Sequence, residues 1–252
     1  MRTPIKDLRH VSKALPVLKT LIPPESKVET FLLFAGDLEI NLAEAERYVT
    51  AHTTEIPIYD FWLTMFEDPE SIADYVKFFY PFPDQDVFNV FQKTFNQQKN
   101  PSARAALFFL LNRCSELGTI SSGNFEQSNF NPLALSYIKR FKKNNFDVKL
   151  DKDLIEALNF DMEADFVFIP AGKFNYSFFQ EGMNTGDEQT RFDHEDLRDA
   201  VSKLKIPTIV LYSHHPRILE IYKDFDTKIL IDKYGKITKD KKVSKEILIA
   251  NF

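Results

Sequence analysis

The sequence predicts an α/β fold in which helices cover both faces of a mostly parallel sheet. Short apolar runs alternate with amphipathic helical patterns over residues 28–60 and again after about residue 145, which is typical of strands joined by crossover helices. Residues 61–145 are aromatic-rich and mostly helical in pattern. The last two apolar runs are joined by a charged turn containing Gly235. We therefore expect a three-layer sandwich with a helical insertion and a terminal antiparallel hairpin.

The first 60 residues predict a helix followed by a strand–helix–strand unit. Within residues 1–22, apolar side chains recur at spacings of three and four, and Pro16 marks a kink or break. The residues that carry this spacing are Leu8, Val11, Leu15 and Leu18. A strand at 28–37, a helix at 38–49 and a second strand at 55–61 that ends in Asp60 then form a βαβ unit.

The middle of the chain predicts a helical insertion. Helical patterns cover residues 71–80, 86–98 and 102–117, and residues 118–132 are loop by composition. The third helix is apolar nearly all round, which indicates a buried helix, with Ser102 as its N-cap. We expect an α/β core made of residues 1–60 and 146–252, interrupted by an insertion at 61–145.

The alternation of strands and helices returns after residue 145. The predicted strands are 146–150, 165–170, 207–213, 227–231 and 245–251, and the predicted helices between them are 152–158, 193–204 and 217–225.

Composition limits the function classes. The net charge of −5 argues against a protein that mainly binds DNA phosphates. The basic clusters at 138–146 and 233–245 could contact phosphates or could be solvated surface. No apolar stretch of about 18 residues exists, and the N-terminus lacks the apolar region of a signal peptide. The single cysteine, Cys114, predicts a buried thiol and fits a reducing, cytoplasmic location.

Short phrases spread over nearly the whole chain carry a family resemblance. In order they are "TPIKDLRHVSKALPVLKTLIP", "LLFAGDL", "IYDF", "LFFLLNRCSELGTISSGNF", "DFVFIPAG", "FDHEDL", "IVLYSH", "EIYKDF" and "EILIANF". Their collinear order resembles the Dam-like (D12 class) DNA adenine-N6 methyltransferases. The resemblance implies a three-layer Rossmann-like methyltransferase sandwich, with S-adenosylmethionine as cofactor and double-stranded DNA as partner.

The catalytic phrase departs from that family. There the strand ends in Asp-Pro-Pro-Tyr, whose carboxylate accepts from the adenine amino group while the ring stacks on the flipped base. The corresponding positions here are Ile169, Pro170, Ala171 and Gly172. Isoleucine cannot accept a hydrogen bond and glycine cannot stack. Because a positioned acceptor contributes about 10²–10⁴ in rate, the resemblance implies a degenerate catalytic motif.

The resemblance also implies a cofactor site at Lys6, Phe34, Gly36, Asp37 and Asp60. The family's Gly-x-Gly lets the backbone approach the cofactor, and "FAGDL" keeps Gly36 only. Asp37 could bind the cofactor's amino group or repel its carboxylate. Asp60 could accept from the ribose hydroxyls or act as a strand-end cap.

On the DNA side, the resemblance implies contacts from Asn112, Arg113 and Ser121. A simpler interpretation of Asn112 and Arg113 is that they cap the C-terminus of a buried helix and favour its dipole. Adjacent side chains on a strand point to opposite faces, so His214 and His215 form a poor metal pair, and we expect no metal site.

These observations favour a catalytically degenerate methyltransferase homologue that acts as a binding or assembly partner of DNA, of an active methyltransferase or of another protein. One alternative is an active S-adenosylmethionine-dependent enzyme with a rebuilt site, which the retained Gly36, Asp60 and Pro170 support. Phe174 or Tyr176, in the loop beyond, could reach back to stack on a base. Another is a DNA-binding module that keeps only the insertion and the basic runs.

Overall fold

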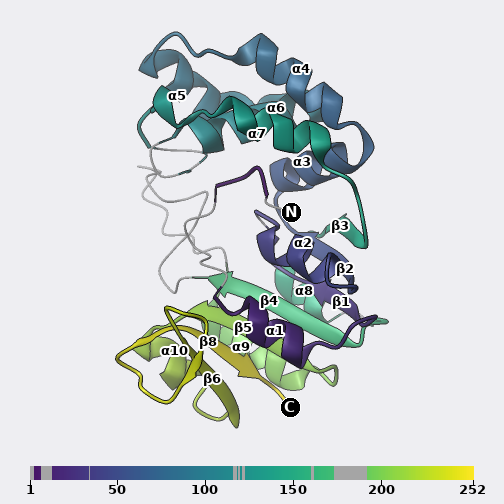
Figure 1. Cartoon of the computed structure of the whole chain (residues 1–252), viewed down its shortest axis with the longest axis vertical. Helices are drawn as coiled ribbons and strands as arrows, with labels where there is room; N and C mark the ends of the chain where they lie inside the picture. Colours follow the sequence, from purple (N-terminus) through teal and green to yellow (C-terminus); the bar gives the residue numbers. More distant parts are fainter. Residues whose placement is uncertain are drawn as a thin grey trace.

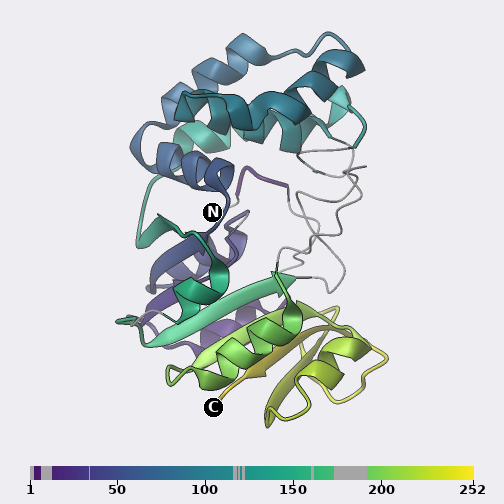
Figure 2. The ribbon, with the colours of Figure 1, turned by 180° about the vertical axis from the view of Figure 1, so that it is seen from behind.

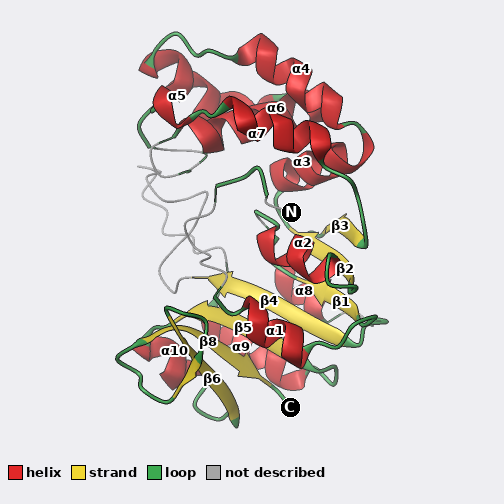
Figure 3. Cartoon of the chain, in the orientation of Figure 1, coloured by secondary structure: helices red, strands yellow, loops and turns green. Residues whose placement is uncertain are grey.

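A computed structural model describes residues 3–6, 13–33, 35–115, 118, 120, 123–159, 162–172 and 192–252. These residues form an 8-stranded sheet in the order β3-β2-β1-β4-β5-β8-β6-β7 (Figure 3). The strands are β1 Lys27–Thr30, β2 Tyr48–Thr53, β3 Phe146–Leu150, β4 Phe166–Gly172, β5 Thr208–Ser213, β6 Thr227–Asp232, β7 Ile237–Thr238 and β8 Ser244–Ala250.

Strands β1 to β5 pair in parallel, and β8 runs antiparallel to both β5 and β6. Without β8 and β7, the order is that of a doubly wound α/β sheet. The predicted α/β class is confirmed. The turn at Gly235 joins β6 to the two-residue β7, and β8 then pairs along the other side of β6.

The helices among the described residues are α1 Leu15–Leu21, α2 Asp37–Ala43, α3 Ile56–Glu67, α4 Pro69–Phe79, α5 Gln85–Thr94, α6 Pro101–Cys114, α7 Pro132–Arg140, α8 Leu154–Leu158, α9 His194–Lys203 and α10 Pro216–Ile221. Short 3₁₀ turns lie at η1 Phe95–Gln97 and η2 Gln127–Asn129. None of the helices in this part of the chain has the length and apolarity needed to span a bilayer.

Two apolar clusters lie on opposite faces of the sheet. One joins β1 and β2 to α1, α2 and α3 and continues into the helices of the insertion. The other joins β4, β5 and β8 to α8, α9 and α10. Figures 1 and 2 show α1 and α2 on one side of the sheet and α8 and α9 on the other, with α4 to α7 stacked beyond one end of it. The predicted three layers and helical insertion therefore correspond to observed elements, and the division into two domains stays a prediction.

The prediction of a strand at 55–61 is wrong. Strand β2 occupies residues 48–53, and residues 56–67 form helix α3. Pro57 lies in the first turn, where its missing N–H costs nothing. Ile58, Phe61, Trp62 and Met65 are buried at spacings of three and four, which is the helical period. Asp60 is therefore a helix residue and not a strand end.

Other boundaries also differ from the predictions. The strand expected at 28–37 ends at Thr30, and Asp37 is already the first residue of α2. The helix expected at 38–49 ends at Ala43, because residues 48–53 pair with β1 and β3. Helix α6 begins after Asn100, whose side chain accepts from the Ala103 N–H, so Ser102 is not the cap. Strand β4 continues to Gly172, two residues beyond the predicted end. Of the first predicted helix, residues 15–21 are helical, and residues 7–12 lie outside the described part.

Candidate functional site

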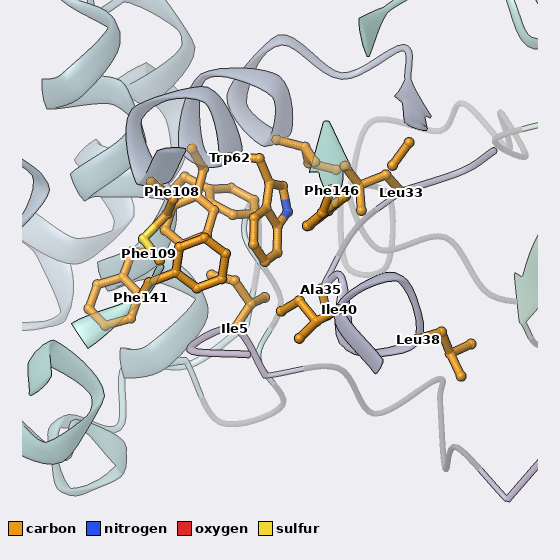
Figure 4. Packing of buried hydrophobic residues seen from close by; sticks show 14 of the residues in the cluster. Ile5, Leu33, Ala35, Leu38, Ile40, Trp62, Phe108, Phe109, Phe141 and Phe146 are labelled. Carbon is orange, nitrogen blue, oxygen red and sulfur yellow. The ribbon is translucent and has the colours of Figure 1, made fainter. Parts of the chain in front are cut away.

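The glycine of the predicted cofactor loop lies against a tryptophan ring. Gly36 precedes α2 with a φ of 72°, a left-handed conformation that favours glycine. A Cβ built on Gly36 would lie 2.3 Å from Cζ2 of Trp62. Figure 4 shows the indole pointing from α3 toward Ala35 and Ile40 at the start of α2. The missing side chain of Gly36 thus makes room for a protein side chain.

Trp62 is fixed by an aromatic cluster. Its ring is fully buried and meets Phe146 at a centroid distance of 5.2 Å, Phe61 at 5.5 Å and Phe141 at 6.0 Å. Edge-to-face contacts of this kind each contribute about 0.5–1.5 kcal/mol beyond the area that they bury. Moving the indole away from Gly36 would break these contacts.

Asp60 is held by an arginine of the insertion. The guanidinium of Arg104 on α6 donates to Asp60 Oδ2 and also to the Gln98 carbonyl. Asp60 is 6% exposed. Burial raises the pKa of its carboxyl, although the hydrogen bond and charge of Arg104 act in the opposite direction. The ribose contact that the resemblance implies stays a prediction, and the structure gives this carboxylate an internal partner.

The degenerate catalytic phrase lies within β4. Ile169 pairs with Val210 of β5 and is fully buried in the apolar cluster formed with α8, α9 and α10. Pro170 and Ala171 continue the strand, and the pairing shifts register between Pro170 and Gly172. The side chain of Ile169 is therefore part of the core. The alternative stacking rings at positions 174 and 176 lie outside the described residues.

The remaining cofactor candidates are dispersed. Asp37 is the first residue of α2, and its backbone carbonyl accepts from the Asn41 side chain. Phe34 lies outside the described residues. The Lys6 ammonium donates to the Arg113 carbonyl at 3.1 Å, and its pKa is lowered by burial and by the charge of Arg113. Lys6 thus lies on the helical insertion.

Asn112 joins the amino-terminal segment to α6. Its Oδ1 accepts from the Lys6 N–H at 2.7 Å, and its Nδ2 donates to the carbonyls of Lys6 and Gly118 at 2.9 and 2.8 Å. It is fully buried, so the amide makes its hydrogen bonds inside the protein and holds the amino-terminal segment against α6. Arg113 is half-buried, which lowers its pKa. Ser121 lies outside the described residues, and the DNA contacts of all three stay predictions.

The prediction of a buried thiol is confirmed. Cys114 is a free cysteine at the buried end of α6, and burial raises the pKa of its thiol to about 12. A thiol with so high a pKa is a poor nucleophile at neutral pH.

A cluster that sequence reasoning missed lies on β1, on β2 and at the residue that follows β3. His52 Nε2 is 2.5 Å from Glu29 Oε2, and His52 Nδ1 is 2.7 Å from Asp151 Oδ2. The imidazole stacks on Phe31 at a centroid distance of 4.4 Å. The sequence feature that could have indicated this cluster is Glu29, an acidic residue inside an apolar run predicted to be a strand. Among the described residues, no group of His, Cys, Asp and Glu side chains is arranged to hold a metal ion.

No protein-family model matches this sequence, and no curated protein matches it. Among solved structures, a TehB-like S-adenosylmethionine-dependent methyltransferase from Corynebacterium glutamicum aligns with a TM-score of 0.40 and 8% identity, over 96% of this chain and 87% of that one. TehB from Haemophilus influenzae aligns with a TM-score of 0.34 and 10% identity, over 94% of this chain and 60% of that one. These values are too low to identify a family, so the fold assignment rests on the sheet itself.

Proposed function

We propose that this chain acts by binding rather than by methyl transfer, as a catalytically degenerate homologue of the Dam-like methyltransferases with duplex DNA as its partner. The observation that carries the proposal is the contact between Trp62 and Gly36. In a cofactor loop, a glycine leaves space for the cofactor to approach the backbone closely. Here the indole ring fills that space. Asp60 and Ile169, from the same predicted site, are engaged with Arg104 and with the apolar core.

Restoring the missing acceptor by one substitution would not rebuild the site. A carboxylate at position 169 would enter a fully buried apolar cluster, where an unpaired charge is strongly disfavoured. Ile169, which replaces the family's carboxylate, is therefore part of the core packing of β4. This supports a protein that keeps the fold for a purpose other than methyl transfer.

The terminal hairpin supports DNA as the partner. The exposed lysines from the end of β6 to the start of β8 are Lys233, Lys236, Lys239, Lys241, Lys242 and Lys245. None of them has an ion-pair partner among the described residues. Tyr234 beside them is 73% exposed, with the Lys233 ammonium 4.9 Å from its ring centroid. Unpaired ammonium groups are suited to phosphate contacts that release counterions.

In the basic cluster at 138–146, two lysines form ion pairs. Lys139 pairs with Glu70, and Lys143 pairs with Asp147. Because acidic side chains already neutralise these lysines, we expect the terminal hairpin to contribute more to DNA affinity than residues 138–146 do.

The test is fluorescence anisotropy of a labelled DNA duplex at several salt concentrations. We expect the wild-type chain to bind at low salt. The triple variant Lys239→Gln, Lys241→Gln, Lys242→Gln should lower the slope of log K against log salt by about 1 for each phosphate that the variant no longer neutralises. The charge-matched control, Lys139→Gln with Lys142→Gln and Lys143→Gln, should change it less.

Absence of DNA binding at low salt, or equal losses in both triple variants, would reject DNA binding through the hairpin. A protein partner, such as an active methyltransferase, would then be the remaining form of a binding function.

A further inference from the structure

A second candidate site lies on the sheet face that α8 covers, and its lining shares no residue with the contact between Gly36 and Trp62. A cavity of about 450 Å³ is lined by Glu29, His52, Lys149, Asp151, Ala157, Met162 and Glu163. This volume falls in the range of small-molecule sites, about 300–1,000 Å³. The side chains come from β1, β2 and β3, from Asp151 just after β3, and from α8 and the residues that follow it.

The buried end of the cavity is polar and internally hydrogen-bonded. His52 is 7% exposed, and both of its ring nitrogens are within hydrogen-bond distance of carboxylate oxygens, on Glu29 and Asp151. Only a ring with protons on both nitrogens donates to both carboxylates, whereas a neutral ring would donate to one group and accept from a protonated carboxyl at the other. The stacked Phe31 ring fixes the imidazole plane. Such a cluster is preorganised, so a ligand meets it without a large ordering cost.

The charged side chains that line the cavity indicate which class of ligand it could bind. Glu29, Asp151 and Glu163 supply carboxylates, against the Lys149 ammonium and the ring of His52. Lys149 and Glu163 are exposed, and Lys149 Nζ lies 3.5 Å from Glu29 Oε1. Burial raises the pKa of the Glu29 carboxyl, but the hydrogen bond and charge of His52 and the charge of Lys149 outweigh this, so the pKa is lowered and the group is ionised at neutral pH.

The carboxylates keep unused acceptor positions. An ionised carboxylate offers about four lone-pair sites, and within this cluster Asp151 and Glu29 are engaged by His52 and Lys149. Ala157 and Met162 add an apolar wall, and a thioether adapts to ligands of varied shape. The three carboxylates outnumber the Lys149 ammonium and the His52 ring, so the lining favours a cation over an anion. A cation with a short alkyl body would contact both the carboxylates and the apolar wall.

We propose that this cavity binds a small organic cation, an alkyl amine or diamine, whose ammonium group donates to Asp151 and Glu29 while its methylenes lie against Met162. This site is separate from the Gly36 region and does not depend on the proposed binding of DNA.

The test uses 1,4-diaminobutane and its uncharged isostere 1,4-butanediol, with the intact chain labelled by ¹³C on its methionine methyl groups. The chain has four methionines, so the Met162 resonance can be assigned from a Met162→Leu variant. We expect diaminobutane to shift the Met162 signal saturably and butanediol not to shift it. Apart from the assignment, this comparison uses only the wild-type chain.

Variants then locate the contact. Asp151→Asn and Glu29→Gln should each weaken diamine binding by about tenfold or more, because each removes a charge-assisted hydrogen bond. Asp147→Asn removes the same charge from β3 at an exposed residue outside the cavity lining, and it should retain binding within about twofold. Circular dichroism and thermal melts establish which variants are folded.

The proposal is overturned if diaminobutane leaves the Met162 signal unchanged, if butanediol shifts it equally, or if Asp147→Asn weakens binding as much as Asp151→Asn does.

Discussion

The indole of Trp62 lies so close to Gly36 that a Cβ at position 36 would be 2.3 Å from the ring. We therefore expect Gly36→Ala to destabilise the fold by about 2 kcal/mol or more, because it combines a contact with Trp62 and a left-handed φ of 72°. In a Trp62→Leu background the contact is gone, and the same substitution should cost only about 1 kcal/mol, from the backbone conformation. Urea denaturation of the four proteins measures the coupling, and strictly additive costs would rule out the contact.

The Asp60–Arg104 pair gives a second prediction. Asp60→Asn should lower the free energy of unfolding by about 3 kcal/mol, because the guanidinium of Arg104 would be left in a mostly buried place without a charged partner. Arg104→Gln in the same chain should recover part of this loss. Asp86→Asn, at an exposed position of α5, serves as the control and should change stability by less than about 0.5 kcal/mol. Equal effects of Asp60→Asn and Asp86→Asn would contradict a structural role for Asp60.

Asn112→Ala should detach the amino-terminal segment from α6. The substitution removes three hydrogen bonds of a fully buried side chain, and we expect a loss of about 2–4 kcal/mol. Hydrogen exchange at the Lys6 amide should become faster, while the exposed control Asn144→Ala should leave it unchanged. If Asn112→Ala weakened DNA binding without changing stability or exchange, the DNA contact implied by the family resemblance would be the better account.

Glu246 makes stability depend on pH. Burial raises the pKa of this carboxyl to about 7, although the backbone N–H groups of Ala14 and Lys13 and the charge of Lys13 oppose the rise. Because the pKa is higher in the folded state than the unfolded value of 4.5, the protonated form favours folding. This contribution is complete below pH 4.5 and is lost as the pH rises through about 7.

The loss is at most about 3 kcal/mol, since one pKa unit corresponds to about 1.4 kcal/mol. Glu246→Gln should remove this slope and raise stability at pH 8. Urea denaturation between pH 5 and 8 checks the prediction, and an unchanged slope in Glu246→Gln would assign the pH dependence to other groups.

Much of the α/β core could be predicted from local patterns, because its strands are apolar runs and its helices have clear periods. The error at 55–61 arose because a short apolar run fits either a strand or a helix. The spacing of Ile58, Phe61 and Trp62 would have decided for a helix.

The site required tertiary information. No local pattern shows that Trp62 would pack against Gly36, since the two residues are 26 positions apart in sequence and meet only in the folded structure, where β2 pairs with β1. The same holds for Glu29, His52 and Asp151, which adjacent strands bring together. Sequence could identify the missing acceptor at Ile169, but its burial in the core depends on α8, α9 and α10.

The most direct test of the central claim is a titration of the wild-type chain with S-adenosylhomocysteine, followed by the fluorescence of its single tryptophan. Because the Trp62 indole lies against Gly36, any ligand seated on that glycine must displace it or change its surroundings. We predict no saturable change in emission up to millimolar ligand. A saturable shift that is weakened by Asp60→Ala would show that the cofactor still binds there, and it would contradict the account.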